Sequence, residues 1–168
     1  MAALTTDGPV ALAARVLGAV SLLAVGVIHL EQYVERYYAI PVIGTLFVLS
    51  FAGATVVSVG LLSPVERLPG RWGAFAVVVL AVLGTGQAAT QFVFLAISEQ
   101  RPLFGFQEPG YDPTAILASR VTEVATVVFL TAFIVARTVR RRVVVEAAST
   151  PEHRDVSVST NPRRPSAP

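Results

Sequence analysis

Two ionisable side chains, Arg120 and Glu123, lie inside an otherwise apolar run that extends from residue 114 to residue 136. A charged side chain that faces hydrocarbon costs about 2.5–3.5 kcal/mol. Residues three positions apart share a helix face, so the guanidinium and the carboxylate can pair with each other. We therefore expect the Arg120–Glu123 pair to face the inside of a helix bundle.

Three further polar side chains have positions that favour a shared site. Gln87 and Gln91 are four residues apart in the run 72–97, and His29 lies near the end of the first apolar run. The two glutamines share one helix face. In an up-and-down bundle, these three residues and the charged pair fall in the same half. The sequence thus predicts a polar pocket, which is a candidate site for a small molecule or an ion.

Two other interpretations of these polar residues stay open. Buried glutamines and Arg–Glu pairs often only hold membrane helices together, at roughly 0.6 kcal/mol per hydrogen bond, and this structural interpretation is the favoured one. In the other interpretation, Arg120 extends to the membrane surface without a partner. His29 by itself is more typical of an interfacial residue than of a ligand.

Composition and motifs exclude several classes of chemistry. The chain has no cysteine, so disulfides, thiol redox chemistry and cysteine-based metal sites are ruled out. Bis-histidine haem needs two axial histidines from facing helices, and the second histidine, His153, lies near the C-terminus. Zinc-protease, nucleophile-elbow and phosphate-loop motifs do not occur. We expect no cofactor and no metal, and an enzyme is the less favoured class.

Acidic side chains outside the apolar runs are the remaining candidates for metal binding. They are Glu31, Glu35, Glu99, Glu108 and Asp112. Their spacing is not that of a tight Asp-x-Asp element, so a solvated acidic surface is favoured over a divalent-cation site.

Four apolar runs must position these residues, at about 10–30, 40–62, 72–97 and 114–136. Each run reaches the roughly 20 residues that a helix needs to cross a bilayer. Only 14% of the residues are charged, whereas soluble domains have about 25%. The sequence predicts an all-α, four-transmembrane-helix, up-and-down bundle within residues 1–147. For the first run, a secretory signal peptide is the alternative.

Arginine placement predicts the orientation of the bundle in the lipid bilayer. Seven arginines flank one side of the predicted spans and two flank the other. The seven are Arg15, Arg67, Arg71, Arg137, Arg140, Arg141 and Arg142, and the two are Arg36 and Arg101. Because positive charge marks the cytoplasmic side, we expect both termini in the cytoplasm and the protein in the plasma (inner) membrane. This orientation explains the net charge of +2, so nucleic acid is not an expected partner.

The C-terminal segment 148–168 differs in composition from the apolar runs. It is rich in Ser, Thr and Pro and lacks the apolar residues that a core needs. We expect a disordered cytoplasmic tail.

Two short elements resemble a known group of proteins. Residues 29–33 read His-Leu-Glu-Gln-Tyr, and residues 40–47 read Ile-Pro-Val-Ile-Gly-Thr-Leu-Phe. They are similar to the His-Leu-x-x-Tyr and Ile-Pro-x-Ile-Gly-x-Leu-Phe elements of small four-helix integral membrane proteins of actinobacteria. The resemblance implies the architecture through the fourth run and no particular activity.

The favoured function is a non-enzymatic accessory or partner-binding membrane subunit. The alternative is a binder or transporter of a small molecule or ion that uses His29, Gln87, Gln91, Arg120 and Glu123. Four helices are few for a monomeric transporter, so transport would require a homo-oligomer.

Overall fold

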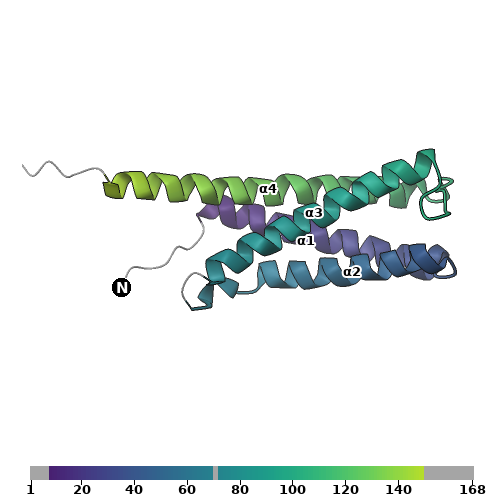
Figure 1. Ribbon diagram of the computed structural model, residues 1–168, viewed down its shortest axis with the longest axis horizontal. Coiled ribbons are helices and arrows are strands. Elements are labelled where there is room, and N and C mark those ends of the chain that lie inside the picture. Colours follow the sequence, from purple (N-terminus) through teal and green to yellow (C-terminus); the bar gives the residue numbers. More distant parts are fainter. Residues whose placement is uncertain (1–7, 70–71, 150–168) are drawn as a thin grey trace, which may run out of the picture.

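The computed structural model describes residues 8–69 and 72–149, and these fold into four long α-helices (Figure 1). The helices are α1 (Pro9–Gln32), α2 (Pro41–Leu62), α3 (Trp72–Gln100) and α4 (Pro113–Ser149). A π-helical turn, η1 (Tyr33–Tyr37), continues α1, and a short 3-10 helix, η2 (Val65–Arg67), lies between α2 and α3. All four long helices are apolar and long enough to cross a membrane. The predicted all-α, four-span membrane bundle is confirmed.

Proline and polar residues set the helix boundaries. Pro9, Pro41 and Pro113 each occupy the first position of a helix, where the missing N–H costs nothing. Asp112 caps α4, because its Oδ1 accepts a hydrogen bond from the Ala115 N–H at 3.0 Å. Helices α3 and α4 extend beyond the apolar runs, through Gln100 and Ser149, because polar residues can stay helical outside hydrocarbon.

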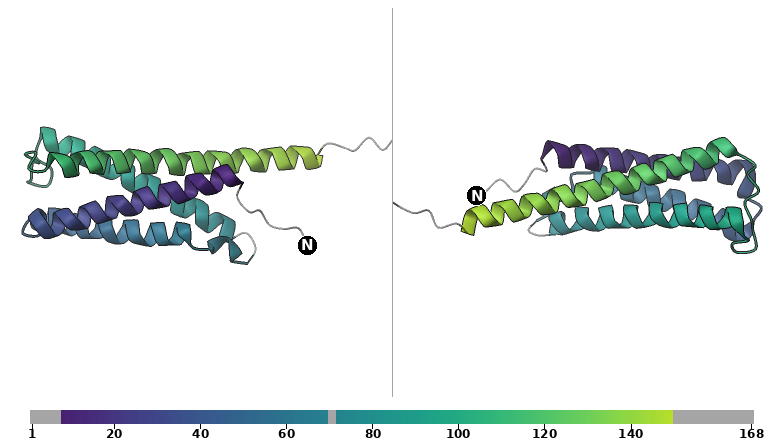
Figure 2. Two further views of the ribbon diagram at one scale, coloured as in Figure 1. Left: turned by 180° about the vertical axis from the view of Figure 1, so that it is seen from behind. Right: turned by 90° about the horizontal axis from the view of Figure 1, so that it is seen from above.

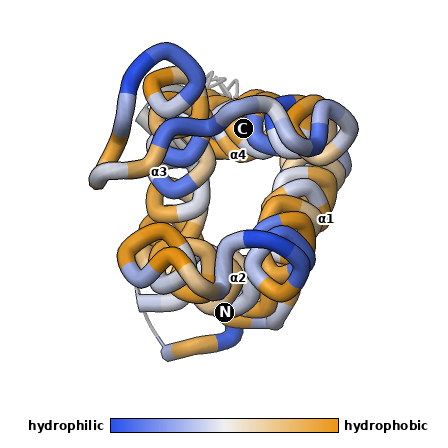
Figure 3. The backbone as a smooth tube through the Cα atoms, turned by 90° about the vertical axis from the view of Figure 1, so that its right-hand side faces the viewer, coloured by the Kyte–Doolittle hydropathy of each residue, from blue (hydrophilic) through white to orange (hydrophobic). Residues whose placement is uncertain are grey.

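The four helices run up and down and form a ring when the bundle is viewed along its long axis (Figure 3). Helix α1 packs against α2 and α4, and α3 packs against the same two helices from the other side. Two segments, η1 and residues 101–112, lie at one end of the bundle, which we call the cap end. The opposite end, which we call the arginine end, holds η2 and the first turns of α1 and α3 (Figure 1).

Small residues allow the helices to approach closely around one large side chain. Leu130 of α4 is fully buried and packs with Leu22 and Phe133 in the core. It lies against Gly18 of α1 and Gly84 of α3, where a side chain in place of either glycine would overlap it. Close contact across small residues is a main source of helix association in membranes, where lipid removes the hydrophobic driving force.

A buried arginine ties the helices together at the arginine end. Arg15 of α1 is only 6% exposed. Its Nε donates to the carbonyl of Leu61 at 2.5 Å, its Nη2 donates to the carbonyl of Ser63 at 3.0 Å, and its Nη1 binds the carboxylate of Glu66. The arginine end therefore also contains a buried cluster of hydrogen-bonded polar groups. The sequence pattern did not predict this cluster.

Helix α4 is longer than its neighbours and continues past them at the arginine end (Figures 1 and 2). Its 37 residues correspond to about 55 Å, whereas the hydrocarbon core is about 30 Å thick. The helix includes residues 148 and 149, which the sequence pattern had assigned to the tail. The rest of the predicted tail, residues 150–168, lies outside the described residues.

Candidate functional site

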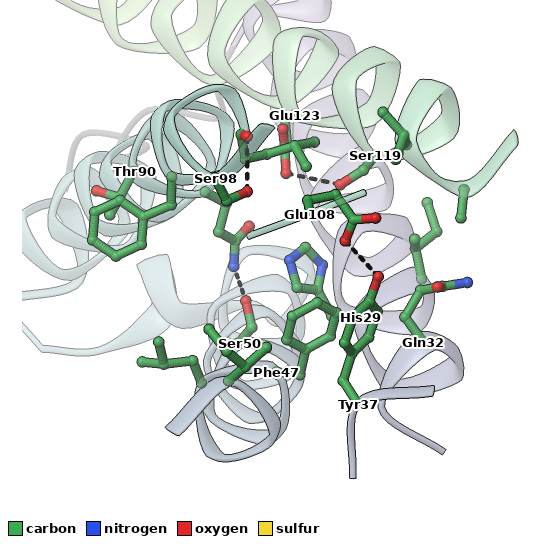
Figure 4. A pocket seen from close by; sticks show the side chains of 18 of the residues that line it. His29, Gln32, Tyr37, Phe47, Ser50, Thr90, Ser98, Glu108, Ser119 and Glu123 are labelled. Carbon is green, nitrogen blue, oxygen red and sulfur yellow. Dashed lines mark hydrogen bonds between the residues drawn. The ribbon is translucent and has the colours of Figure 1, made fainter. Parts of the chain in front are cut away.

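A cavity of about 420 Å³ lies between the four helices at the cap end (Figure 4). Most of its wall is apolar, with Leu46 and Phe47 of α2, Leu95 of α3 and Ile116 of α4 among the lining residues. The polar lining residues come from all four long helices, from η1 and from the segment 101–112. They are His29, Gln32, Tyr37, Ser50, Gln87, Thr90, Gln91, Ser98, Glu108, Asp112, Ser119 and Glu123.

The two glutamines of α3 connect this helix to Ser50 of α2. Nε2 of Gln87 donates to the backbone carbonyl of Ser50 at 2.8 Å, and Nε2 of Gln91 donates to the Ser50 hydroxyl. Gly53 leaves room for the first of these contacts, because a Cβ there would lie 3.1 Å from Oε1 of Gln87. Oε1 of Gln91 is buried and has no hydrogen-bond partner. The amides thus hold α2 to α3 and leave one acceptor unsatisfied.

Glu123 is the most deeply buried ionisable group of the cavity wall, with an exposed fraction of 1%. Its Oε1 accepts a hydrogen bond from the Ser119 hydroxyl at 2.9 Å, one helical turn away (Figure 4). Its Oε2 is buried without a hydrogen-bond partner. A buried carboxylate is costly unless it is paired, so this oxygen favours a donor from outside the chain.

His29 is held in one orientation beside these groups. Its Nδ1–H donates to the carbonyl of Val25 at 2.8 Å, one turn earlier in α1. A carbonyl can only accept, so the proton is assigned to Nδ1. The ring also lies 5.0 Å from the ring of Phe47, centroid to centroid. These contacts fix the imidazole against the apolar part of the wall.

The segment 101–112 closes the cavity at the cap end. The hydroxyl of Tyr37 donates to Oε2 of Glu108 at 2.5 Å (Figure 4). Oε1 of Glu108 accepts the N–H of Gly110 at 2.9 Å. The Glu108 N–H in turn donates to the carbonyl of Ser98 at 2.9 Å. Phe106 meets the Tyr37 ring edge-on at 5.5 Å. These contacts anchor the segment over the ends of α1 and α3.

The exposed lining residues of the cavity lie on α2 and α3. Four lining residues are exposed there: Leu49 of α2, with 60% of its surface accessible, and Gly86, Thr90 and Phe94 of α3. All four lie within the apolar spans. In a bilayer these four residues would therefore face the hydrocarbon region, whereas segment 101–112 covers the end of the bundle.

The structure brings together most of the residues that the sequence nominated. His29, Gln87, Gln91 and Glu123 line one cavity, and Arg120 does not. The expected Arg120–Glu123 pair is wrong, because Nη2 of Arg120 binds the carboxylate of Glu99 on α3. The extra turn of α3 brings Glu99 beside α4, and the Glu123 carboxylate turns to Ser119.

Two contributions to the site were missed by sequence reasoning. Glu108 was assigned to a solvated acidic surface, but it is only 9% exposed and anchors segment 101–112 to the ends of the helices. Ser50 is one of several hydroxyl residues in α2, and its distance of 41 residues from Gln91 hides their contact. Phe106, two residues before Glu108, is the feature of the sequence that suggests a packed segment, and its ring contacts that of Tyr37.

Within residues 8–69 and 72–149, no group of three His, Asp or Glu side chains is placed to hold a metal ion. The chain was also compared with protein-family models, with curated proteins and with solved structures. None of these comparisons found a match.

Proposed function

We propose that this small integral membrane protein binds a small amphipathic molecule in the cavity at the cap end. The observation that carries the proposal is the combination of volume and lining. Ligand sites typically enclose about 300–1,000 Å³ and combine an apolar wall with a few convergent polar groups. A cavity of about 420 Å³ with Gln91, Ser119 and Glu123 in an apolar wall meets this description.

We place the opening of the cavity between α2 and α3, where its exposed lining residues lie, and this position favours a ligand that is dissolved in the bilayer. Leu49 and Phe94 border the opening, and a lipid-soluble molecule can pass between such side chains without losing its apolar surroundings. Gln87 bonds α2 to α3 below the opening and limits its extent. The ligand then enters sideways, with its polar part leading towards Glu123.

The cap end faces the outside of the cell in this proposal, and both termini face the cytoplasm. The arginine distribution supports this orientation, because the end of the bundle with Arg15 and Arg67 also carries the arginines that follow the α4 span. The plasma membrane of an actinobacterium is the location that fits the resemblance of residues 29–33 and 40–47.

An accessory or partner-binding role is the second candidate, and the length of α4 favours it. The span ends near Arg140, but the helix continues through Ser149 past the rest of the bundle (Figure 2). A helix that projects from a membrane with several arginines can dock on a partner subunit or on a second copy of the chain. In this version, the cavity regulates or stabilises the assembly.

The test is native mass spectrometry of the protein released from mild detergent. Wild type should carry a bound molecule below about 1 kDa, because a site of this volume holds only a small ligand. The variant Ala115→Phe, which fills the cavity from α4, should lose that molecule. Ala132→Phe places the same ring on an exposed position of α4 and should retain it. Retention of the adduct by Ala115→Phe, or its absence from wild type, would contradict the proposal.

A further inference from the structure

Two unsatisfied acceptor atoms on neighbouring helices of the cavity wall restrict the chemistry of the ligand. Oε2 of Glu123 on α4 and Oε1 of Gln91 on α3 are both buried, and neither has a hydrogen-bond partner. Both residues line the same cavity. Leaving such atoms unsatisfied costs roughly 1–3 kcal/mol each, and more for a charged group. A ligand that donates hydrogen bonds to both atoms recovers this cost.

The neighbouring donors are already engaged elsewhere. The Ser119 hydroxyl donates to the other oxygen of Glu123, and the Tyr37 hydroxyl donates to Glu108. Nδ1–H of His29 donates to the Val25 carbonyl. None of these three groups donates to Oε2 of Glu123, so the donor that this oxygen needs has to come with the ligand.

The charge of the wall favours a cation. Glu108, Asp112 and Glu123 line the cavity, and the described lining residues include no arginine or lysine. Asp112 has Arg36 at 3.5 Å, on the outer side of the cap. Arg120, the cation nearest in sequence to Glu123, binds Glu99. The charge of Arg120 acts on Glu123 without forming an ion pair with it, so the buried carboxylate is further stabilised by a cationic ligand.

We infer that the ligand is an amphipathic amine whose protonated nitrogen lies between Glu123 and Gln91, with its apolar body against α2 and α3. An ammonium group with N–H bonds supplies both the positive charge and the two donors, whereas a quaternary ammonium supplies only the charge. This inference depends on the proposed cavity-binding function and assigns the chemical class of the ligand.

Four probes with one apolar body and different head groups test the inference. They are phenylbutylamine, phenylbutanol, phenylbutyrate and phenylbutyl-trimethylammonium, titrated at neutral pH into the full-length protein in nanodiscs of zwitterionic lipid. Calorimetry with empty nanodiscs as the reference gives the affinity of each probe. Phenylbutylamine should bind about tenfold or more tightly than any of the other three, the difference expected for a hydrogen-bonded charged group.

Two variants locate the preference within the chain. Glu123→Gln is nearly isosteric and should lower the amine affinity to the level of the alcohol without changing the alcohol affinity. Glu31→Gln removes an exposed acid that does not line the cavity and should keep the preference. If Glu123→Gln does not fold, the wild-type probe series still decides the question.

The outcomes separate the inference from the function on which it rests. Binding of none of the four probes contradicts the cavity-binding function itself. Equal binding of amine and alcohol leaves that function standing and overturns the amine assignment. Equal binding of the primary amine and the trimethylammonium probe overturns the requirement for N–H donors.

Discussion

The guanidinium of Arg15 on α1 binds the carboxylate of Glu66 in η2, so a residue near the start of the first helix holds the connection between the second and third. The same side chain donates to the carbonyl of Leu61 at the end of α2 and to that of Ser63, which also accepts the Val65 N–H. One arginine therefore closes a helix end and fixes a loop.

The variant Arg15→Leu should lose these contacts and leave Glu66 without its cation. We expect a loss of about 3 kcal/mol, at the low end for a broken buried pair because Glu66 is partly accessible. Thermal unfolding in detergent measures the change, and the exposed neighbour Arg67, changed to Leu, is the control. Equal melting temperatures for Arg15→Leu and Arg67→Leu would show that the Arg15 contacts do not stabilise the fold.

Gly73 should not tolerate a side chain, because η2 lies against it. A Cβ at this position would be 2.7 Å from the carbonyl oxygen of Val65 and 2.8 Å from that of Glu66. The variant Gly73→Ala should cost about 1–3 kcal/mol, as expected for an overpacked contact with backbone. Gly86→Ala in the same helix has no atom within 4 Å of the new Cβ and should gain up to about 1 kcal/mol from helix propensity. The order of the two melting temperatures tests the contact, and a reversed order would refute it.

The N-cap that Asp112 provides for α4 predicts that the protein is less stable in acid. The Ala115 N–H lowers the pKa of the Asp112 carboxyl below its usual value, with further help from Gln32 and Arg36. A depressed pKa stabilises the folded state above the unfolded value of about 4, and this contribution disappears as the pH falls further. Wild type should therefore approach the stability of Asp112→Asn between neutral pH and about pH 3. Thermal unfolding measures both proteins over this pH range. A constant difference in melting temperature between wild type and Asp112→Asn would contradict a stabilising charge at the N-cap.

The proposed orientation can be tested with single cysteines, because the chain has none of its own. Gln107 in the cap and Leu68 beside η2 are both exposed and lie at opposite ends of the bundle. In intact cells, Gln107→Cys should react with an impermeant thiol reagent, and Leu68→Cys should react only after permeabilisation. The opposite labelling pattern would invert the orientation.

The four membrane-spanning helices were predictable because an uncharged apolar run of sufficient length identifies each of them. Runs without charge, such as the one that ends at Leu62, leave the backbone no alternative to a helix in hydrocarbon. The extra turns of α3 and α4 were not predictable from hydropathy, since residues such as Glu99 are polar and still helical. Hydropathy predicts the part of each helix that lies inside the bilayer. Helix propensity determines how far the helix continues beyond it.

The site was predictable in four of its members, and their hydrogen-bond and ion-pair partners were not. Helical periodicity puts Gln87 and Gln91 on one face, which the structure retains. The same reasoning paired Arg120 with Glu123 because they are three residues apart, whereas the structure pairs Arg120 with Glu99, 21 residues away. Local spacing shows which partners are within reach along one helix, and only the packing of α3 on α4 decides between them.

Trp72, the first residue of α3, is the one tryptophan of the sequence and has 63% of its surface exposed at the arginine end. The protein thus contains a native fluorophore at a single depth. Quenching by lipids that are brominated at defined acyl positions reads out where this end of the bundle lies in the bilayer. Gln87 lies fifteen residues further along α3, about 22 Å away, so a ligand in the cavity does not touch the indole. A change in its emission during a titration would therefore report tilting of α3.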